Sequence, residues 1–466
     1  MATSTTGQPP PPEEKSQHTG SVDAVERTGA AKPRSGTAAL ARRVHFLAGL
    51  AVAPFLVIMC LTGLANAFTP QIVNTVHGQE LFADTGTGSP RPASDQVAAA
   101  AAAHPEGIVK AVIPPPEPDR TTRVVLSVPG LPDIDEFSEE DLTVYVNPYT
   151  DHVQGELTTV KDRPPAQVWL RNAHGNLHLG PPGRLYSEFA TSWVPLIVLG
   201  GLVLWLGRRR SRGLLTSSRR STSEHARLRG LHGWLGLCLS LGLSALAVTG
   251  FSQSNFVGDR VDQLLTTLDS GEPSLESEKV AAPPGAARID IDRVLETAGA
   301  DGLRGELTIT APSEPGEVFT VEETGEGWPV QSDSIAVHPY TGQVTERLAF
   351  DDYPLLAKLN VLGVRAHDGT LFGIPNQIVV SLVALGTLVL IVLAYRMWWS
   401  RRPRGASWPP APPPIWRAHP KTALLALVTA AVILVWVLPV VGTTLIGFLV
   451  TDMVINAVKR RRRPRT

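Results

Sequence analysis

Two stretches of the sequence carry the same pattern: His45-Phe-Leu-Ala-Gly49 followed by Leu61-Thr62-Gly63, and His232-Gly-Trp-Leu-Gly236 followed by Val248-Thr249-Gly250. In both, the threonine comes seventeen residues after the histidine, and the residues between them are largely apolar. The register matches without a gap. Such self-similarity predicts an internal duplication, and a duplication decides the fold before any single helix or strand does.

Two further pairs of segments extend the match. Tyr145-Val-Asn-Pro-Tyr-Thr-Asp-His-Val153 parallels Ala336-Val-His-Pro-Tyr-Thr-Gly-Gln-Val344. Arg171-Asn-Ala-His-Gly-Asn-Leu-His-Leu-Gly180 parallels Arg365-Ala-His-Asp-Gly-Thr-Leu-Phe-Gly373, and each leads into an apolar run. The sequence therefore predicts two copies of one unit, residues 42–210 and 227–402, in the same orientation.

The apolar runs predict a membrane protein. The chain has 466 residues, of which 43% are hydrophobic. A helix that crosses the hydrocarbon layer needs roughly 20 apolar residues. Besides four such runs, the apolar stretch 422–458 has Pro439 and Gly442 near its middle, which favours a helical hairpin. Two cysteines, Cys60 and Cys238, exclude a disulfide scaffold and an all-cysteine iron–sulfur site. The four predicted transmembrane helices are 42–68, 189–207, 231–251 and 374–399.

The charges predict the topology. Lys and Arg collect in cytoplasmic segments, and the loop 208–230 has eight arginines and one acid. The linker 400–421 and the tail 459–466 are also basic, whereas the long segments 69–188 and 252–373 together carry a net charge of −21. We therefore expect cytoplasmic termini, two extracytoplasmic domains and a plasma-membrane location. The polar tail 1–41 and the proline-rich residues 402–414 are predicted to be disordered.

One alternative concerns the first apolar run. Ala65-Asn66-Ala67 resembles a signal-peptidase site. A preceding tail of more than forty residues, and a run longer than the usual signal core, argue against cleavage there.

The two long segments read as small α+β domains. Ser94-Asp95 before the alanine-rich residues 96–104 predicts a capped helix, and residues 290–299 take that place in the second copy. Pro339-Tyr-Thr-Gly342 predicts a turn. Alternating residues predict strands at 123–128, 143–147, 306–310, 317–322 and 334–337.

These motifs carry a resemblance over residues 40–402. A helix opening with His-x-x-x-Gly and ending in Thr-Gly, then Val-x-Pro-Tyr-Thr-Gly-x-Val, then Ala-His-x-x-Leu-x-x-Gly before the next helix, resembles the PepSY-associated transmembrane helix family. The resemblance implies a polytopic helical membrane protein with two PepSY-like α+β domains. It also implies an iron-regulated protein, with haem-containing reductases of ferric siderophores among the family's members. Residues 422–458, Asn147 and Asp151 depart from the pattern.

The histidines suggest haem ligands. The repeat places His45 and His232 at the same depth near the cytoplasmic ends of the first and third helices, and His174 and His367 near the opposite face. Two imidazoles from neighbouring helices give a six-coordinate haem iron suited to electron transfer. We therefore expect one or two haem b groups held by these four residues. His178 lies four residues after His174 and would share its helix face, but its repeat partner is Leu371.

Structural roles for the same histidines stay open. His45 and His232 lie beside arginines, and a histidine at a helix end can simply extend into the lipid headgroups. His174 and His367 precede apolar runs and can serve as capping or turn residues.

The preferred functional hypothesis is a haem b electron-transfer protein that reduces ferric iron or a ferric siderophore at the extracytoplasmic face. No GxGxxG or GxxxxGK[ST] motif occurs, so an electron donor such as quinol is expected to be a separate molecule. Membrane lipid is a further expected partner. Nucleic acid is not expected to be a partner.

Two rival hypotheses belong to other classes. The first is a non-redox PepSY module whose acidic domains bind a peptide, peptidase or envelope partner. The second is transport of a metal or siderophore by alternating motion of the two copies. Transport is the weaker, because Asp452 is the only acid in the apolar stretches and no helix shows a midplane interruption.

Overall fold

The computed structural model describes Gly7 and residues 36–461, apart from residues 85–87, 136–137, 210–223, 277–278, 284, 404, 406–411 and 413–420. The predicted disorder of residues 1–41 and 402–414 falls largely on residues outside this described part, as does most of the basic loop 208–230. A helix begins at Gly36, so the last residues of the predicted tail are helical.

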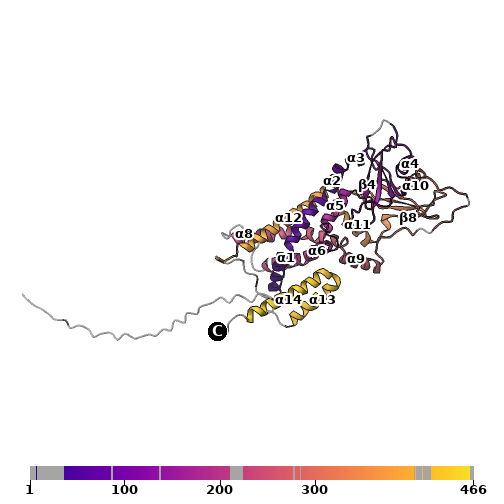
Figure 1. The fold of residues 1–466 in the computed structure, drawn as a ribbon. Helices are drawn as coiled ribbons and strands as arrows, with labels where there is room; N and C mark the ends of the chain where they lie inside the picture. Colours follow the sequence, from indigo (N-terminus) through magenta and orange to yellow (C-terminus); the bar gives the residue numbers. More distant parts are fainter. Residues whose placement is uncertain are drawn as a thin grey trace, which may run out of the picture. The chain divides into compact units, whose positions relative to one another are not determined.

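Four long helices form the membrane part: α1 (Gly36–Ala67), α6 (Gly180–Arg209), α8 (Glu224–Phe251) and α12 (Ile374–Trp399). Each is long and apolar enough to cross a membrane. In Figure 1 they run side by side, and α1 and α8 each contact both α6 and α12, which closes a ring of four helices. The chain is thus a membrane protein with four candidate spans.

The C-terminal apolar stretch forms two further helices, α13 (Lys421–Val437) and α14 (Pro439–Arg461). They pack so closely that a Cβ atom at Gly442 of α14 would lie 2.2 Å from the backbone nitrogen of Val435 in α13. Their apolar residues Ala431, Val441 and Leu445 share a buried cluster with Ala48 and Val52 of α1 and Trp193 of α6. The hairpin is therefore attached to one side of the four-helix ring.

The strands of both copies form one sheet rather than two separate sheets. Its order is β4-β3-β2-β1-β5-β6-β7-β8, and every neighbouring pair is antiparallel. The copies meet where Val112 of β1 pairs with Ile309 of β5, so neither strand is left with an open edge. The strands are β1 (Ile108–Ile113), β2 (Thr122–Ser127), β3 (Asp141–Val146), β4 (Val153–Thr159), β5 (Leu307–Thr310), β6 (Phe319–Glu323), β7 (Ser334–Val337) and β8 (Val344–Leu348).

Two helices, α4 (Ala93–Ala103) and α10 (Ile291–Asp301), share the core of this sheet. The cap expected from Ser94 and Asp95 is instead supplied by the other copy, because the Asp292 carboxylate accepts hydrogen bonds from the backbone N–H groups of Ala93 (2.6 Å) and Ser94 (3.1 Å). In α10 the N-cap is Asp290, as the sequence predicts; its carboxylate accepts from the N–H of Arg293 at 2.9 Å.

A partly buried ion cluster also joins the two halves of the sheet. The Arg123 guanidinium of β2 lies 2.6 Å from the Asp162 carboxylate, which belongs to the same copy, and 2.9 Å from the Glu306 carboxylate of the second copy. Removing one member of such a cluster would leave a buried charge without its partner, which is costly. The cluster therefore fixes the loop between β4 and the next helix.

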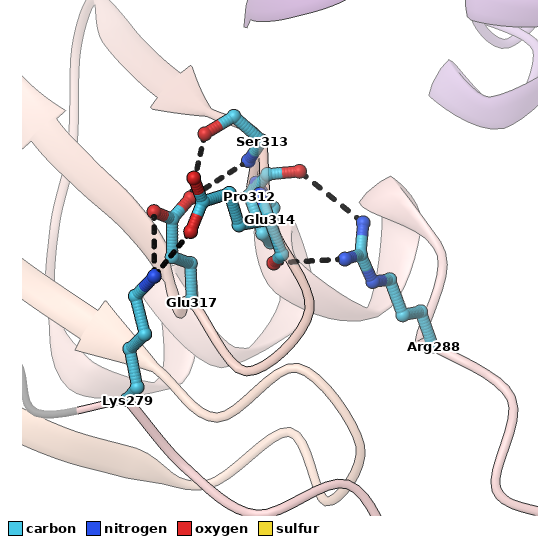
Figure 2. A network of polar contacts seen from close by, with 6 residues as sticks. All are labelled: Lys279, Arg288, Pro312, Ser313, Glu314 and Glu317. Carbon is cyan, nitrogen blue, oxygen red and sulfur yellow. Dashed lines mark hydrogen bonds and ion pairs between the residues drawn. The ribbon is translucent and has the colours of Figure 1, made fainter.

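A polar network holds the loop between β5 and β6, as Figure 2 shows. The Glu317 carboxylate accepts from the N–H groups of Ser313 (2.9 Å) and Glu314 (3.0 Å), and Lys279 pairs with Glu314. The Arg288 guanidinium donates to the carbonyl oxygens of Pro312 and Glu314.

The remaining helices are short and connect the sheet to the bundle. Two of them, α5 (Pro165–Gly175) and α11 (Leu355–Asp368), lead into α6 and α12. The others are α2 (Thr69–Val76), α3 (Gly78–Leu81), α9 (Phe256–Thr267) and the 3-10 turn η1 (Phe350–Asp352).

Candidate functional site

Two histidine pairs lie inside the helical part. His45 of α1 and His232 of α8 form the far-side pair, with ring centroids 6.2 Å apart and ring planes inclined at 73°. His174 of α5 and His367 of α11 form the sheet-side pair, with centroids 6.3 Å apart and planes inclined at 52°. The structure thus brings together the same histidines that the sequence repeat pairs.

Backbone carbonyl groups orient the far-side pair. Nδ1 of His45 lies 2.8 Å from the carbonyl oxygen of Ile197 in α6, and Nδ1 of His232 lies 3.2 Å from the carbonyl oxygen of Leu390 in α12. A carbonyl oxygen can only accept a hydrogen bond, so Nδ1 carries the hydrogen in both rings. In a neutral ring, Nε2 then keeps its lone pair for a ligand.

Threonine side chains orient the sheet-side pair. The Thr62 hydroxyl donates to the carbonyl oxygen of Ile58 at 2.9 Å, so its oxygen accepts from Nδ1 of His174 at 3.0 Å. The second copy repeats this arrangement, with Thr249 bonded to the Ala245 oxygen at 2.9 Å and to Nδ1 of His367 at 3.0 Å. With the hydrogen on Nδ1, a neutral ring here too keeps the lone pair of Nε2 for a ligand.

Glycines make room for the imidazoles. A Cβ atom at Gly63 would lie 3.0 Å from Cε1 of His174, and one at Gly250 would lie 3.4 Å from Cε1 of His367. In α6, a Cβ atom at Gly201 would lie 3.2 Å from Cε1 of His45. The Thr-Gly motifs therefore supply both a hydrogen-bond acceptor and the space for the ring that it orients.

The charge state of the sheet-side pair suits metal ligation. Burial lowers the pKa of His174 to about 3, and the neighbouring His367 and Arg171 act in the same direction. Burial also lowers the pKa of His367, against the opposing charge of Asp368. Both imidazoles are therefore neutral near pH 7, which is the form that binds a metal ion.

Two imidazoles that share one metal ion have a defined spacing. Metal–nitrogen bonds of about 2 Å, with about 1 Å more from each nitrogen to its ring centre, place the two centroids about 6 Å apart. Both pairs have this spacing. Among the described residues no group of three or more His, Cys, Asp or Glu side chains is arranged to hold a metal ion, so each site offers two nitrogen ligands only. A haem would suit such a site, because the porphyrin would supply the other nitrogen ligands of the iron.

The family model of the PepSY-associated TM region matches residues 42–401, over three quarters of the chain. The chain belongs to this family. The resemblance carried by the sequence motifs is thereby confirmed. The match includes all four histidines of the two pairs and ends before α13, so the hairpin lies outside the matched region. No curated protein matches the chain.

His178 is separate from both pairs in this PepSY-associated protein. It is exposed, has a positive φ of 54°, and its ring stacks on Trp169 at a centroid distance of 5.1 Å. The turn after α5 ends the helix before His178, so the four-residue spacing does not place it on the same helix face as His174.

Two cavities lie near the starts of α6 and α12. The first, about 270 Å³, lies between the β2–β3 loop and the start of α6 and is polar, with Asp133, Asp135 and Asn176 in its lining. The second, about 680 Å³, lies between the β6–β7 loop and the start of α12. Trp328 and Phe372 line the second cavity with side chains that are 64% and 55% exposed.

Proposed function

We propose that this PepSY-associated protein is a haem b electron-transfer protein with two haem sites, one at each histidine pair. The observation that carries the proposal is the arrangement of four imidazoles in two pairs, each ring with Nδ1 in a hydrogen bond. Ligand histidines are typically oriented in this way by a hydrogen bond from their other ring nitrogen. A haem with two imidazole ligands exchanges one electron without binding a further ligand.

The spacing along α1 supports electron transfer between two levels of the membrane. His45 lies seventeen residues before Thr62, which contacts His174. At 1.5 Å per residue, the two pairs are separated by about 26 Å along the helix. The chain's part in the reaction is to hold the four imidazoles neutral and correctly oriented, and to keep water away from them.

The proposed direction is outward. The arginine-rich segments favour the far-side pair at the cytoplasmic face, and the sheet then lies in the extracytoplasmic space. We propose quinol or a reduced carrier as the donor and ferric iron, free or in a siderophore, as the acceptor. The cavity beside Trp328 is the proposed docking place for the acceptor, because it lies next to the helix that carries His367.

An absorption spectrum tests the cofactor. After expression with ample haem, the protein purified in detergent is expected to show a Soret band and the spectrum of a six-coordinate haem. Replacing His45 and His232 together by alanine should remove the far-side haem, whereas His178→Ala should leave the haem content unchanged. A colourless preparation would favour the non-redox reading, in which the domains bind a peptide or envelope partner.

Reoxidation kinetics test the acceptor. Protein reduced with dithionite should be reoxidised by a ferric chelate, and Trp328→Ala should slow this step several-fold. Trp169→Ala is the matched control, because Trp169 is also exposed, at 59%, but lies outside the lining of the larger cavity. Equal rates for the two variants would exclude docking at Trp328.

A further inference from the structure

The two histidine pairs differ in what accepts their Nδ1 hydrogen. At the far-side pair the acceptors are main-chain carbonyl oxygens of Ile197 and Leu390. At the sheet-side pair they are the hydroxyl oxygens of Thr62 and Thr249, and His367 also makes a backbone hydrogen bond to Leu246. Each sheet-side imidazole therefore has a hydroxyl partner, and the contacts of the two far-side imidazoles are to carbonyl oxygens.

The acceptor affects the electron density of the ligating nitrogen. An amide carbonyl is a stronger hydrogen-bond acceptor than a hydroxyl, and a stronger acceptor makes the imidazole more basic at Nε2. A more basic axial ligand stabilises ferric over ferrous iron and lowers the reduction potential of the site. Each threonine hydroxyl donates its own hydrogen to a helix carbonyl, which strengthens the oxygen as an acceptor but leaves it weaker than an amide oxygen.

Charged groups act in opposite directions at the sheet-side pair. At the sheet-side pair, the positive Arg171 acts on His174 and the negative Asp368 acts on His367, so their effects oppose each other. The hydroxyl partners of Thr62 and Thr249 are therefore a feature that both sheet-side imidazoles share.

We propose that Thr62 and Thr249 are positioning residues that set the sheet-side site to a higher reduction potential than the far-side site. This inference rests on the proposed haem function and gives it a direction: electrons move energetically downhill from the far-side pair toward the sheet. The repeated Thr-Gly motif then fixes the direction of electron flow through the choice of a hydroxyl acceptor in both copies.

A redox titration followed by the optical spectrum tests the proposal. The wild-type protein should titrate in two components. Replacing both threonines by valine removes the acceptors while keeping the side-chain shape. The reduction potential of the upper component should then rise by about 59 mV, which corresponds to a change of about tenfold in the one-electron equilibrium constant. The lower component should stay where it is. A shift of the lower component, or of neither, would overturn the proposal.

Two controls accompany this titration. Thr62→Ser and Thr249→Ser keep the hydroxyl and should leave both potentials in place. Thr387→Val removes a threonine that, like the other two, bonds to the carbonyl four residues earlier, at 2.7 Å from Val383, and should also have no effect.

A second measurement covers the case in which the valine variants lose a haem. With His45 and His232 replaced by alanine, the remaining sheet-side component should have the upper potential. If it has the lower potential, the assignment is wrong even though haem binds. Absence of any haem in the wild type would instead defeat the proposed function itself, so the two failures are distinguishable.

Discussion

At the scale of single residues, Gly63 is the most restrictive position beside an imidazole. A methyl group there would lie 3.0 Å from Cε1 of His174, so Gly63→Ala should displace the ring and weaken the sheet-side site. We expect the purified variant to lose the sheet-side haem and keep the far-side one, measured as haem per protein. Gly49→Ala in the same helix is the control, because no atom lies within 4 Å of the added Cβ. Equal haem loss in both variants would contradict this role for Gly63.

Asp162 makes the stability of the sheet depend on pH. Burial raises the pKa of Asp162 to about 6; the Arg123 charge acts to lower it, and the nearby Glu306 raises it further. Between about pH 4 and pH 6 the folded protein therefore holds a proton that the unfolded chain has released, and stability falls as the pH rises through this range. The thermal unfolding midpoint should fall over the same pH range, and Asp162→Asn should abolish that fall. A fall unchanged in the variant would assign it to other groups.

The histidine pairs show how far residue-level prediction reaches. The repeat alone selected His45 with His232 and His174 with His367, and the rings lie close together in the structure. Their role as haem ligands stays a prediction. The sequence also singled out Thr62 and Thr249 as part of the repeated Thr-Gly motif, and in the structure both bond to their own helix. Their second bond, to an imidazole, depends on α5 and α11, which the sequence pattern did not predict as helices.

At the scale of elements, Asp292 links a helix of one copy to the start of a helix of the other. Removing a side chain that caps a helix costs about 1 kcal/mol, so Asp292→Ala should lower the free energy of unfolding by about that amount. Asp95→Ala, in the first turn of α4, is the control, since the expected capping role of that residue is taken by Asp292. Urea titrations followed by near-UV circular dichroism would measure both, and equal losses would refute the assignment.

Strand prediction succeeded for several strands in the interior of the sheet. The predicted strands at 123–128, 143–147 and 334–337 correspond to β2, β3 and β7, which lie inside the sheet. The edge strands β4 and β8 were not predicted, because their residues are more polar and mostly partly exposed. β1 was missed too, and with it the pairing to β5 that makes one sheet of two copies. Pairing between strands almost two hundred residues apart leaves no local signal in the sequence.

At the scale of the whole molecule, the hairpin α13–α14 is an addition outside the matched family region. It contacts α1 and α6 through a buried cluster, and the indole N–H of Trp193 donates to the Thr444 hydroxyl at 3.0 Å. Truncation after residue 403 should therefore keep both haem sites while lowering the unfolding temperature. Thr444→Val removes only the hydrogen bond and should cost about 1 kcal/mol. Loss of haem on truncation would show that the hairpin supports the sites directly.

The continuous sheet has a consequence for how the molecule can be divided. Each half of the chain, cut within residues 210–223, would hold one imidazole of each pair and would leave β1 or β5 as an open edge. Neither half would contain a complete histidine pair, whereas the two halves together would contain both pairs. Co-expressed as two polypeptides, they should reconstitute a coloured heterodimer, joined by the same central strands that unite them in the intact chain.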